Sequence, residues 1–473
     1  MAVSDSISKS LRDSKTLRWT VLFIVSFTMM MGYFMTDVMS PLENMLETSK
    51  EMGGFGWSSS EYGFFSGSYG FINVFLLMLF FGGLILDRCG VRFTGLLSCG
   101  LMVVGAGIKW YALSQVSPDA TTYVDLPILG LSDANVKNQV LLAALGFSIF
   151  GMGSEITGIT VTKVIAKWFT GYELALAMGL QVATARLGTA LALGASAPVA
   201  QAINLPAPVL FGLVMLLIGL FVYIVYCVMD RKLDASEIAN GQTLSDEAQE
   251  EPFRLRDLMV IFRNPGFWMI TLLCLLFYGG VFPFLKFATK LMIYKYGVSE
   301  GLAGTIPALL PFGTIFLTPL FGGVYDKKGR GATLMILGSL LLTLVHILFT
   351  LPVLEYVWFG VALMILLGIA FSLVPSAMWP SVPKIIPMKQ LGSAYAIIFY
   401  IQNIGLSLIP ILIGNVIDRY SKMELPDGTL DYDFTIPMAI FASFGVLAVL
   451  IGLVLKTINK KMRYGLEDVN IKS

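Results

Sequence analysis

Long apolar runs separated by short polar segments make up nearly all of this chain. Each run is about 20 residues or longer, the length that an α-helix needs to cross the hydrocarbon core of a bilayer. Twelve runs meet this criterion: 19–39, 60–86, 93–113, 139–161, 174–197, 207–229, 266–285, 302–323, 332–351, 356–378, 391–414 and 435–456. The pattern therefore predicts an all-α membrane protein with twelve transmembrane helices.

The longest polar segment divides these runs into six and six. It holds several acidic residues, followed by a basic amphipathic piece from Arg254 to Arg263 that predicts an interfacial helix. We expect a cytoplasmic linker here, between two six-helix bundles. The predicted regions are an N-tail at 1–18, a first bundle at 19–229, the linker at 230–265, a second bundle at 266–456 and a C-tail at 457–473.

One polar turn occurs twice, at corresponding places in the two halves. The first copy runs from Gly83 to Arg92 and the second from Gly322 to Arg330. Each has the order glycine, acid, base, glycine, base between two apolar runs. A single copy would be typical of a basic loop that only fixes topology. Two copies indicate homologous halves, which in a membrane protein indicate a transporter.

Within these turns a carboxylate can pair with neighbouring bases and hold one conformation of the protein. The pair would break in another conformation, so the turns are candidate gates. The predicted gating residues are Asp87, Arg88, Arg92, Asp326, Lys327 and Arg330.

Composition and charge support a membrane protein and fix its expected orientation. The chain has 473 residues, is 56% hydrophobic and only 13% charged, and has a net charge of +1, which gives no reason to expect a nucleic-acid partner. With the N-terminus inside, 23 Lys and Arg residues fall on the inner side and 8 on the outer side, including Lys109, Lys286 and Lys290. The positive-inside rule then places both termini in the cytoplasm. No Asn-X-Ser/Thr sequon occurs in an outer loop, which favours a bacterial inner membrane.

Few residues in the chain are suited to covalent chemistry. The four cysteines lie in or beside apolar runs or the Asp87 turn, and we expect no disulfide, no metal site and no cofactor. The single histidine, His346, is interpreted as structural. Without a cluster of nucleophile and base we predict no enzyme, and a sensor that binds without transporting is the rival from another class.

The duplicated turn resembles the loop signature of the major facilitator superfamily. The second copy departs from it, since Lys327 and Lys328 stand where the first copy has Arg88 and Cys89. Other segments resemble the branch of this superfamily that contains the lysosomal dipeptide transporters of animals. They are Lys167-Trp168-Phe169, Glu173–Gly179, Ala185–Gly188, Val281–Phe284, Met378-Trp379-Pro380, Gln390–Tyr395 and Ile401–Gly405. The resemblance implies alternating access, with an acid on the fourth span and an arginine on the fifth facing the substrate.

Two ionisable residues lie deep in apolar runs, where a charge is costly and marks function by default. Glu155 is in the fourth span and Arg186 in the fifth, with depths that differ by roughly 9 Å at 1.5 Å per residue. Two interpretations stay open. The residues form a structural ion pair, or they form a split clamp in which Glu155 binds an ammonium group and Arg186 a carboxylate. A dipeptide is long enough to reach from Glu155 to Arg186 in the split clamp.

Internal symmetry adds candidates from the second half. The segment from Glu173 to Gly188 aligns without gaps on Gln390 to Gly405, a shift of 217 positions. Arg186 then corresponds to Asn403, and its neighbour to Gln402. Both amides are candidates for substrate binding, with an interhelical amide contact as the alternative.

Weaker candidates are polar or aromatic residues within the spans. Tyr33 and Asp37 share a face of the first span, and Tyr69 and Asn73 share a face of the second. Asp37 can also be read as a solvated helix end. Tyr278 precedes a predicted kink and outer gate at Phe282-Pro283, and Trp379 is expected near the cytoplasmic end of the tenth span, as an inner gate or interface anchor.

Together these features predict a monomeric alternating-access carrier whose partners are the lipid bilayer and a small substrate. The substrate is expected to be a small zwitterion, most sharply a dipeptide or short peptide, moved by facilitated, uniport-like transport. The alternative is an organic-anion, monocarboxylate-like carrier in which Arg186 binds the carboxylate and Glu155 only orients it.

Overall fold

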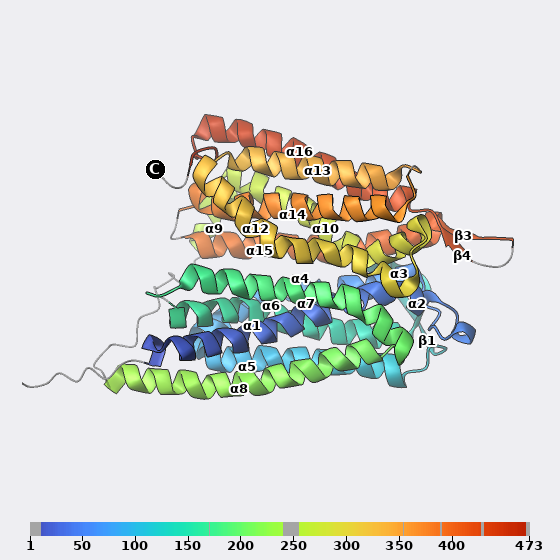
Figure 1. The fold of residues 1–473 in the computed structure, drawn as a ribbon, viewed down its shortest axis with the longest axis horizontal. Helices are drawn as coiled ribbons and strands as arrows, with labels where there is room; N and C mark the ends of the chain where they lie inside the picture. The colour runs from blue at the N-terminus through green and yellow to red at the C-terminus, as the bar shows by residue number, and fades with distance from the viewer. Residues whose placement is uncertain are drawn as a thin grey trace, which may run out of the picture.

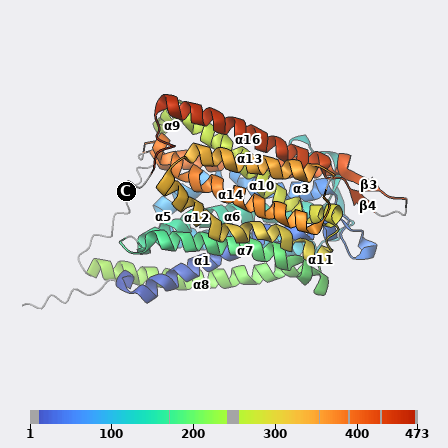
Figure 2. The same ribbon diagram turned by 45° about the horizontal axis from the view of Figure 1, so that its top comes forward.

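The computed structural model describes residues 11–169, 171–239, 255–352, 354–387, 390–426 and 430–469. Long, roughly antiparallel helices form two bundles that lie side by side (Figures 1 and 2). The N-terminal half of the chain builds one bundle and the C-terminal half builds the other. This confirms the predicted helical membrane fold with two bundles.

The first bundle contains the helices of the first six predicted spans. Its second span is assembled from short pieces, α3 (Ser59–Gly67), the 3₁₀ turn η4 (Ser68–Gly70) and α4 (Phe71–Phe75), followed by the start of α5. The long helices are α1 (Lys15–Asp37), α5 (Met78–Gln115), α6 (Asn138–Phe169), α7 (Leu174–Ala202) and α8 (Ala207–Ala239).

The second bundle is preceded by the short amphipathic helix α9 (Leu255–Phe262), located where an interfacial helix is predicted. Its long helices are α10 (Pro265–Tyr296), α12 (Thr305–Lys328), α13 (Gly331–Thr350), α14 (Val357–Ile385), α15 (Leu391–Val416) and α16 (Thr435–Met462).

Short elements occupy the connections at one end of the molecule. Two antiparallel hairpins, which the apolar pattern did not predict, pair β1 (Thr121–Leu126) with β2 (Leu131–Lys137) and β3 (Lys422–Glu424) with β4 (Leu430–Tyr432). We call this the hairpin end, and the opposite end, where α1 begins and α16 ends, the terminal end (Figure 1). The remaining pieces are η2 (Ser40–Leu42), α2 (Glu43–Glu47), η3 (Lys50–Met52), α11 (Glu300–Ala303) and the π-helical turn η7 (Ile417–Ser421).

The second span differs from the continuous helix predicted over 60–86. It breaks at Leu77, whose φ of 53° lies in the left-handed region that a leucine rarely adopts. Its last part then runs into the third span through Gly90, which has a φ of 72°. For this reason 11 rather than twelve helices of the described part are individually long and apolar enough to span a membrane. The twelve crossings of the predicted architecture remain, with one of them interrupted.

Two other helices run further than their predicted spans. α8 continues to Ala239, inside the segment predicted as a linker, and the rest of that segment up to Arg254 lies outside the described residues. α10 continues through Pro283 to Tyr296, so the helix does not end at the predicted kink at Phe282-Pro283. A proline removes a single backbone donor, and neighbouring helices can compensate for the loss in a membrane helix.

The extended helices also correct the charge count. Lys109 and Lys290 are fully buried and Lys286 is largely buried, although all three were assigned to outer loops. Without these three lysines fewer basic residues remain on the outer side, so the excess of basic residues on the inner side is larger than predicted.

Candidate functional site

The guanidinium of Arg186 lies between the two bundles, surrounded by aromatic rings. Its Cζ is 5.7 Å from the ring centre of Tyr33 on α1, 5.3 Å from Phe282 on α10 and 5.2 Å from Phe371 on α14. These distances are in the range of cation–π attraction. Among the described residues, Arg186 has no hydrogen bond or ion pair. It is therefore a cation without an anionic partner.

A close helix contact positions this cation against Tyr33. A Cβ at Gly188 would lie only 2.1 Å from the carbonyl oxygen of Met30, so only glycine allows α7 to pack this closely on α1. Arg186 is two residues from this contact, and Tyr33 is three residues from Met30.

Glu155, on α6, is bound by one hydroxyl group. Tyr69 donates a hydrogen bond of 3.0 Å to Glu155 Oε1. The tyrosine is placed by another close contact, since a Cβ at Gly151 would lie 2.0 Å from the carbonyl oxygen of Tyr69. The second carboxylate oxygen remains available to another donor.

Glu155 and Arg186 form no ion pair in the described part of the chain. Both lie within electrostatic range of the Tyr33 hydroxyl. This conformation therefore does not contain the structural ion pair, which is one of the two interpretations of these residues. An acid and a base face the same region and each keeps bonding capacity for a ligand.

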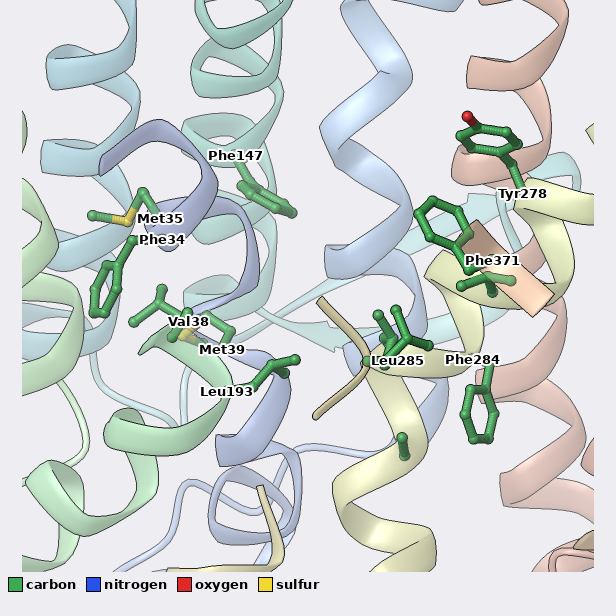
Figure 3. Close-up of a cluster of buried hydrophobic side chains, with 14 of the residues drawn as sticks. Phe34, Met35, Val38, Met39, Phe147, Leu193, Tyr278, Phe284, Leu285 and Phe371 are labelled. Atoms are coloured by element: carbon green, nitrogen blue, oxygen red, sulfur yellow. The ribbon is translucent and has the colours of Figure 1, made fainter. Parts of the chain in front are cut away.

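An aromatic cluster continues from Arg186 into the second bundle. The indole of Trp379 donates a 2.9 Å hydrogen bond to the Tyr278 hydroxyl, and its rings stack on Phe399 with centroids 4.9 Å apart. Phe371 packs on Tyr278 at 5.6 Å, and Figure 3 shows these two side chains together. The expected placement of Trp379 as an interface anchor is wrong, because α14 continues to Ile385 and the indole points to α10.

The amide candidates are buried residues of α4 and α15. Asn73 is fully buried with neither amide atom hydrogen-bonded within the described residues. Asn403 donates to the carbonyl of Phe399 on its own helix, and its Oδ1 has no partner there. Gln402 is also buried, with 7% of its surface exposed. Among the described residues, none of the three forms a hydrogen bond with Glu155 or Arg186.

Asp37 belongs to a different group, which closes the hairpin end between the bundles. Lys286 on α10 donates to Asp37 Oδ1 at 2.7 Å and to the carbonyl of Thr36 at 2.9 Å. Asp37 therefore forms an ion pair between the bundles. It is not at a solvated helix end, and its ion-pair partner is Lys286 rather than Arg186.

Further contacts seal the same end. Asn44 bonds to Tyr294 and Glu300, Glu47 bonds to Lys290 and Tyr432, and Asp418 accepts from the backbone of Ser59 and Ser60. Buried apolar side chains from both bundles pack beside these contacts, including Leu193 from the first and Leu285 from the second (Figure 3). Outside the hairpin end, the hydroxyl of Tyr400 on α15 donates a hydrogen bond of 3.2 Å to the carbonyl of Val74 on α4. No ion pair joins the bundles at the terminal end within the described residues.

The duplicated turns form contacts inside their own bundles. Asp87 pairs with Lys163 of α6 at 3.1 Å rather than with Arg88 or Arg92. Arg92 instead pairs with two acids of α8, at 3.3 Å to Asp230 and 2.6 Å to Asp234. In this conformation the acid and Arg92 of the first turn thus pair with neighbouring helices, and the gating role of the turn stays a prediction.

The second turn packs against the C-terminal segment. Gly329 has a φ of 65°, and the backbone N–H of Arg330 donates to the carbonyl of Glu467 at 3.0 Å. Asp326 has a partner, and Lys327 is exposed.

Several residues of this site were not predicted from the sequence. Phe371 gives no signal, since it is one apolar residue in an apolar span. Phe282 was interpreted only as part of a kink. Lys286 and Lys290 carried a usable signal, a charge beside an apolar run, but the predicted end of that span at 285 placed them in a loop.

Comparison with known proteins identifies the family of the chain. The model of the Major Facilitator Superfamily matches residues 22–410. The lysosomal dipeptide transporter MFSD1 of Bos taurus is 26% identical over 421 residues, covering 86% of this chain and 81% of that protein. The human protein of the same name is 25% identical over 425 residues, covering 86% and 82%.

Solved structures with similar folds include membrane transporters of low sequence identity. A mutant of the nucleoside transporter NupG has a TM-score of 0.67 at 14% identity, covering 93% of this chain and 99% of its own. A mutant of the peptide transporter POT in complex with alafosfalin has a TM-score of 0.64 at 14% identity, covering 94% of each chain. With its two helical bundles and a family match over most of its length, the chain belongs to the major facilitator superfamily of membrane transporters.

Proposed function

We propose that this transporter carries dipeptides, held at opposite ends by Glu155 and Arg186. One observation carries the proposal. Arg186 lies between the bundles and Glu155 lies within electrostatic range of the same Tyr33 hydroxyl, yet the acid and the base are not paired with each other. Leaving two charges unneutralised at membrane depth is costly, and a zwitterionic ligand would neutralise both at once.

The chemistry of each side chain suits one end of a dipeptide. The planar fork of Arg186 can bind the carboxylate through two parallel hydrogen bonds. Glu155 can accept from the ammonium group with the oxygen that Tyr69 does not hold. Two extended residues span about 7 Å, comparable with the depth difference of roughly 9 Å between the two side chains.

The aromatic rings around Arg186 support the same proposal. They offer cation–π attraction without neutralising the charge, and they limit the access of water. In a drier environment the attraction between the guanidinium and a carboxylate becomes stronger. The relatives of this chain that are named lysosomal dipeptide transporter MFSD1 support the same substrate class.

We further propose that the conformation described here faces the cytoplasm. Ion pairs join the bundles at the hairpin end, whereas the described residues show no ion pair between the bundles at the terminal end, which the basic residues place inside. We also propose that the protein is a monomer in a bacterial inner membrane and that it moves its substrate down the concentration gradient of that substrate. A protonophore should then leave dipeptide uptake unchanged.

Labelling tests this orientation. A membrane-impermeant maleimide added to intact cells should modify Met52→Cys at the hairpin end and spare Cys89, which is exposed at the terminal end. The reverse pattern would place the termini outside.

An organic-anion carrier remains the second candidate, and one observation favours it. Tyr69 already binds Glu155, so the acid can be read as orienting the site while Arg186 alone takes a carboxylate. The two candidates differ in whether a free amino group is required.

Thermal stabilisation of the purified transporter separates them. We expect alanyl-alanine to raise the unfolding temperature, and both N-acetyl-alanyl-alanine and alanyl-alanine amide to raise it much less. Stabilisation by the N-acetyl peptide and by lactate, equal to that by the free dipeptide, would support the organic-anion carrier instead.

A further inference from the structure

Glu43 is a buried carboxylate whose oxygens have no hydrogen-bond donor. It is the first residue of α2, directly after the first span, and it is fully inaccessible to solvent. Neither Oε1 nor Oε2 is hydrogen-bonded within the described residues. An ionised carboxylate in that environment is strongly disfavoured unless a cation is bound to it.

The nearest cation is already engaged by another acid. Lys290 Nζ lies 2.5 Å from Glu47 Oε2 and 3.0 Å from the Ser59 hydroxyl, and it is 3.8 Å from the ring centre of Tyr432. Its distance to Glu43 Oε1 is 3.6 Å, too long for a hydrogen bond. Glu47 also accepts from the hydroxyls of Ser59 and Tyr432, so its oxygens are satisfied.

Other ionisable groups near Glu43 add negative charge or none. Asp418 of η7 is the third acid, and its carboxylate accepts from the backbone at the start of α3. The tyrosines that face Glu43 are Tyr62 on α3, Tyr294 on α10 and Tyr432 on β4. One lysine thus faces three acids in a closed, buried cluster.

We propose that Glu43 is a proton-binding site, occupied when the bundles are joined at the hairpin end and vacated when they separate there. Closure brings Glu43 out of water while Lys290 binds Glu47, and a proton from the solvent at the hairpin end adds to one Glu43 oxygen. Opening moves Lys290 away with α10. Both glutamates, which belong to the first bundle, then meet water, and Glu43 returns its proton to the same side.

The sign of the pH dependence follows from the proton count. The closed state holds one proton more than the open state, so acid on the hairpin side favours closure. For one proton, the ratio of closed to open molecules rises up to tenfold per unit of falling pH. Because the proton enters and leaves on one side, no net proton transport accompanies the substrate. The proposal requires only that this end opens, and it is independent of the substrate's identity.

The distance between the bundles at the hairpin end measures closure directly. We would attach spin labels to Met52→Cys on η3 and Met423→Cys on β3, both exposed, with Cys89 replaced by serine. The full chain in nanodiscs, without substrate, would be measured from pH 8 to pH 5. Asp37→Asn provides a reference in which the loss of the pair with Lys286 weakens closure and populates both states.

The expected results differ for each variant. In the Asp37→Asn reference the short distance should become more populated as pH falls. Adding Glu43→Gln, a neutral isostere, should give a closed population that no longer depends on pH. Adding Lys290→Gln should keep or steepen the dependence, up to a hundredfold per unit, since two glutamates would then bind protons. A flat response in the reference, or an unchanged one with Glu43→Gln in a monodisperse sample, would overturn the proposal.

Discussion

Arg186 combines a full charge with surroundings that do not neutralise it. Three aromatic rings lie 5.2 to 5.7 Å from its Cζ, and each such contact contributes on the order of 0.5–2 kcal/mol. A hydrogen-bonded carboxylate would contribute more in the same place. The arginine is thus prepared for an anionic ligand, and Glu155 is its complement for a cationic one.

The hydroxyl of Tyr69 provides a residue-scale test, because it holds one oxygen of Glu155. Tyr69→Phe should lower the affinity for a free dipeptide by about 10- to 150-fold, the loss of one hydrogen bond to a charged group worth about 1.5–3 kcal/mol. Binding of the N-acetyl dipeptide should change little, since that ligand has no ammonium group. Tyr395→Phe, which removes a hydroxyl bonded to the carbonyl of Trp379, is the matched control. Isothermal titration measures both, and an equal loss for the two ligands would contradict the assigned role.

At this scale the sequence identified site residues only where an ionisable residue stands in an apolar run. Glu155 and Arg186 are predictable because ionisable residues in apolar runs are rare. Phe371 is not predictable, since an aromatic residue in a membrane helix is ordinary until its neighbours are known. Asp37 was recognised but misassigned, because its partner Lys286 lies 249 positions away in the chain.

At the scale of elements, glycine contacts set the positions of the binding residues. Gly151 of α6 packs on the carbonyl of Tyr69 at the η4 turn, where a Cβ would approach to 2.0 Å. Gly151→Ala should push η4 away and reduce dipeptide affinity at least as much as Tyr69→Phe. Gly158→Ala on the same helix is the control, since its Cβ would meet only Met29 Cε at 3.9 Å. Equal affinities for the two alanine variants would show that this contact does not position Tyr69.

A buried ion cluster fastens the terminal end of the first bundle. Asp230 of α8 is fully buried and accepts from the indole of Trp168 and the hydroxyl of Tyr226, while Lys167 and Arg92 pair with it. Asp230→Asn should destabilise the protein by about 2–4 kcal/mol, because the cations and the two aromatic donors around this buried position lose its negative charge.

The neighbouring Asp234 is a matched control for this change. It pairs with the same two bases but has neither aromatic donor and is partly exposed. Asp234→Asn should cost less, measured by thermal unfolding in one detergent. A larger effect of Asp234→Asn would assign the stabilising role to the surface pair instead.

Element positions followed well from apolar run lengths, but interruptions did not. Pro283 predicted a kink, yet the helix α10 continues through it to Tyr296. The actual break is at Leu77, where nothing in the local sequence demands one. It occurs in the span whose Gly67 and Gly70 pack against Ser407 of α15, so tertiary packing rather than local preference explains its irregularity.

At the scale of the whole molecule, the two bundles meet unequally at their two ends. Ion pairs and close helix contacts join them at the hairpin end, and Glu155 and Arg186 lie between them. The duplicated turn predicted this two-bundle architecture, since it indicates homologous halves. It did not predict the conformation, which depends on contacts such as those of Asp37 and Lys290 between residues far apart in the sequence.

Uptake of a radiolabelled dipeptide into proteoliposomes tests the central claim most directly. The wild-type transporter should take up alanyl-alanine until its concentration is the same inside and outside the liposomes. Unlabelled dipeptide should compete with this uptake, and the N-acetyl dipeptide should not. Arg186→Ala and Glu155→Gln should each lower uptake at least tenfold, as expected for the loss of a charge-assisted contact worth about 1.5–3 kcal/mol. Uptake by either variant at the wild-type rate, or none by the wild type, would contradict the dipeptide clamp.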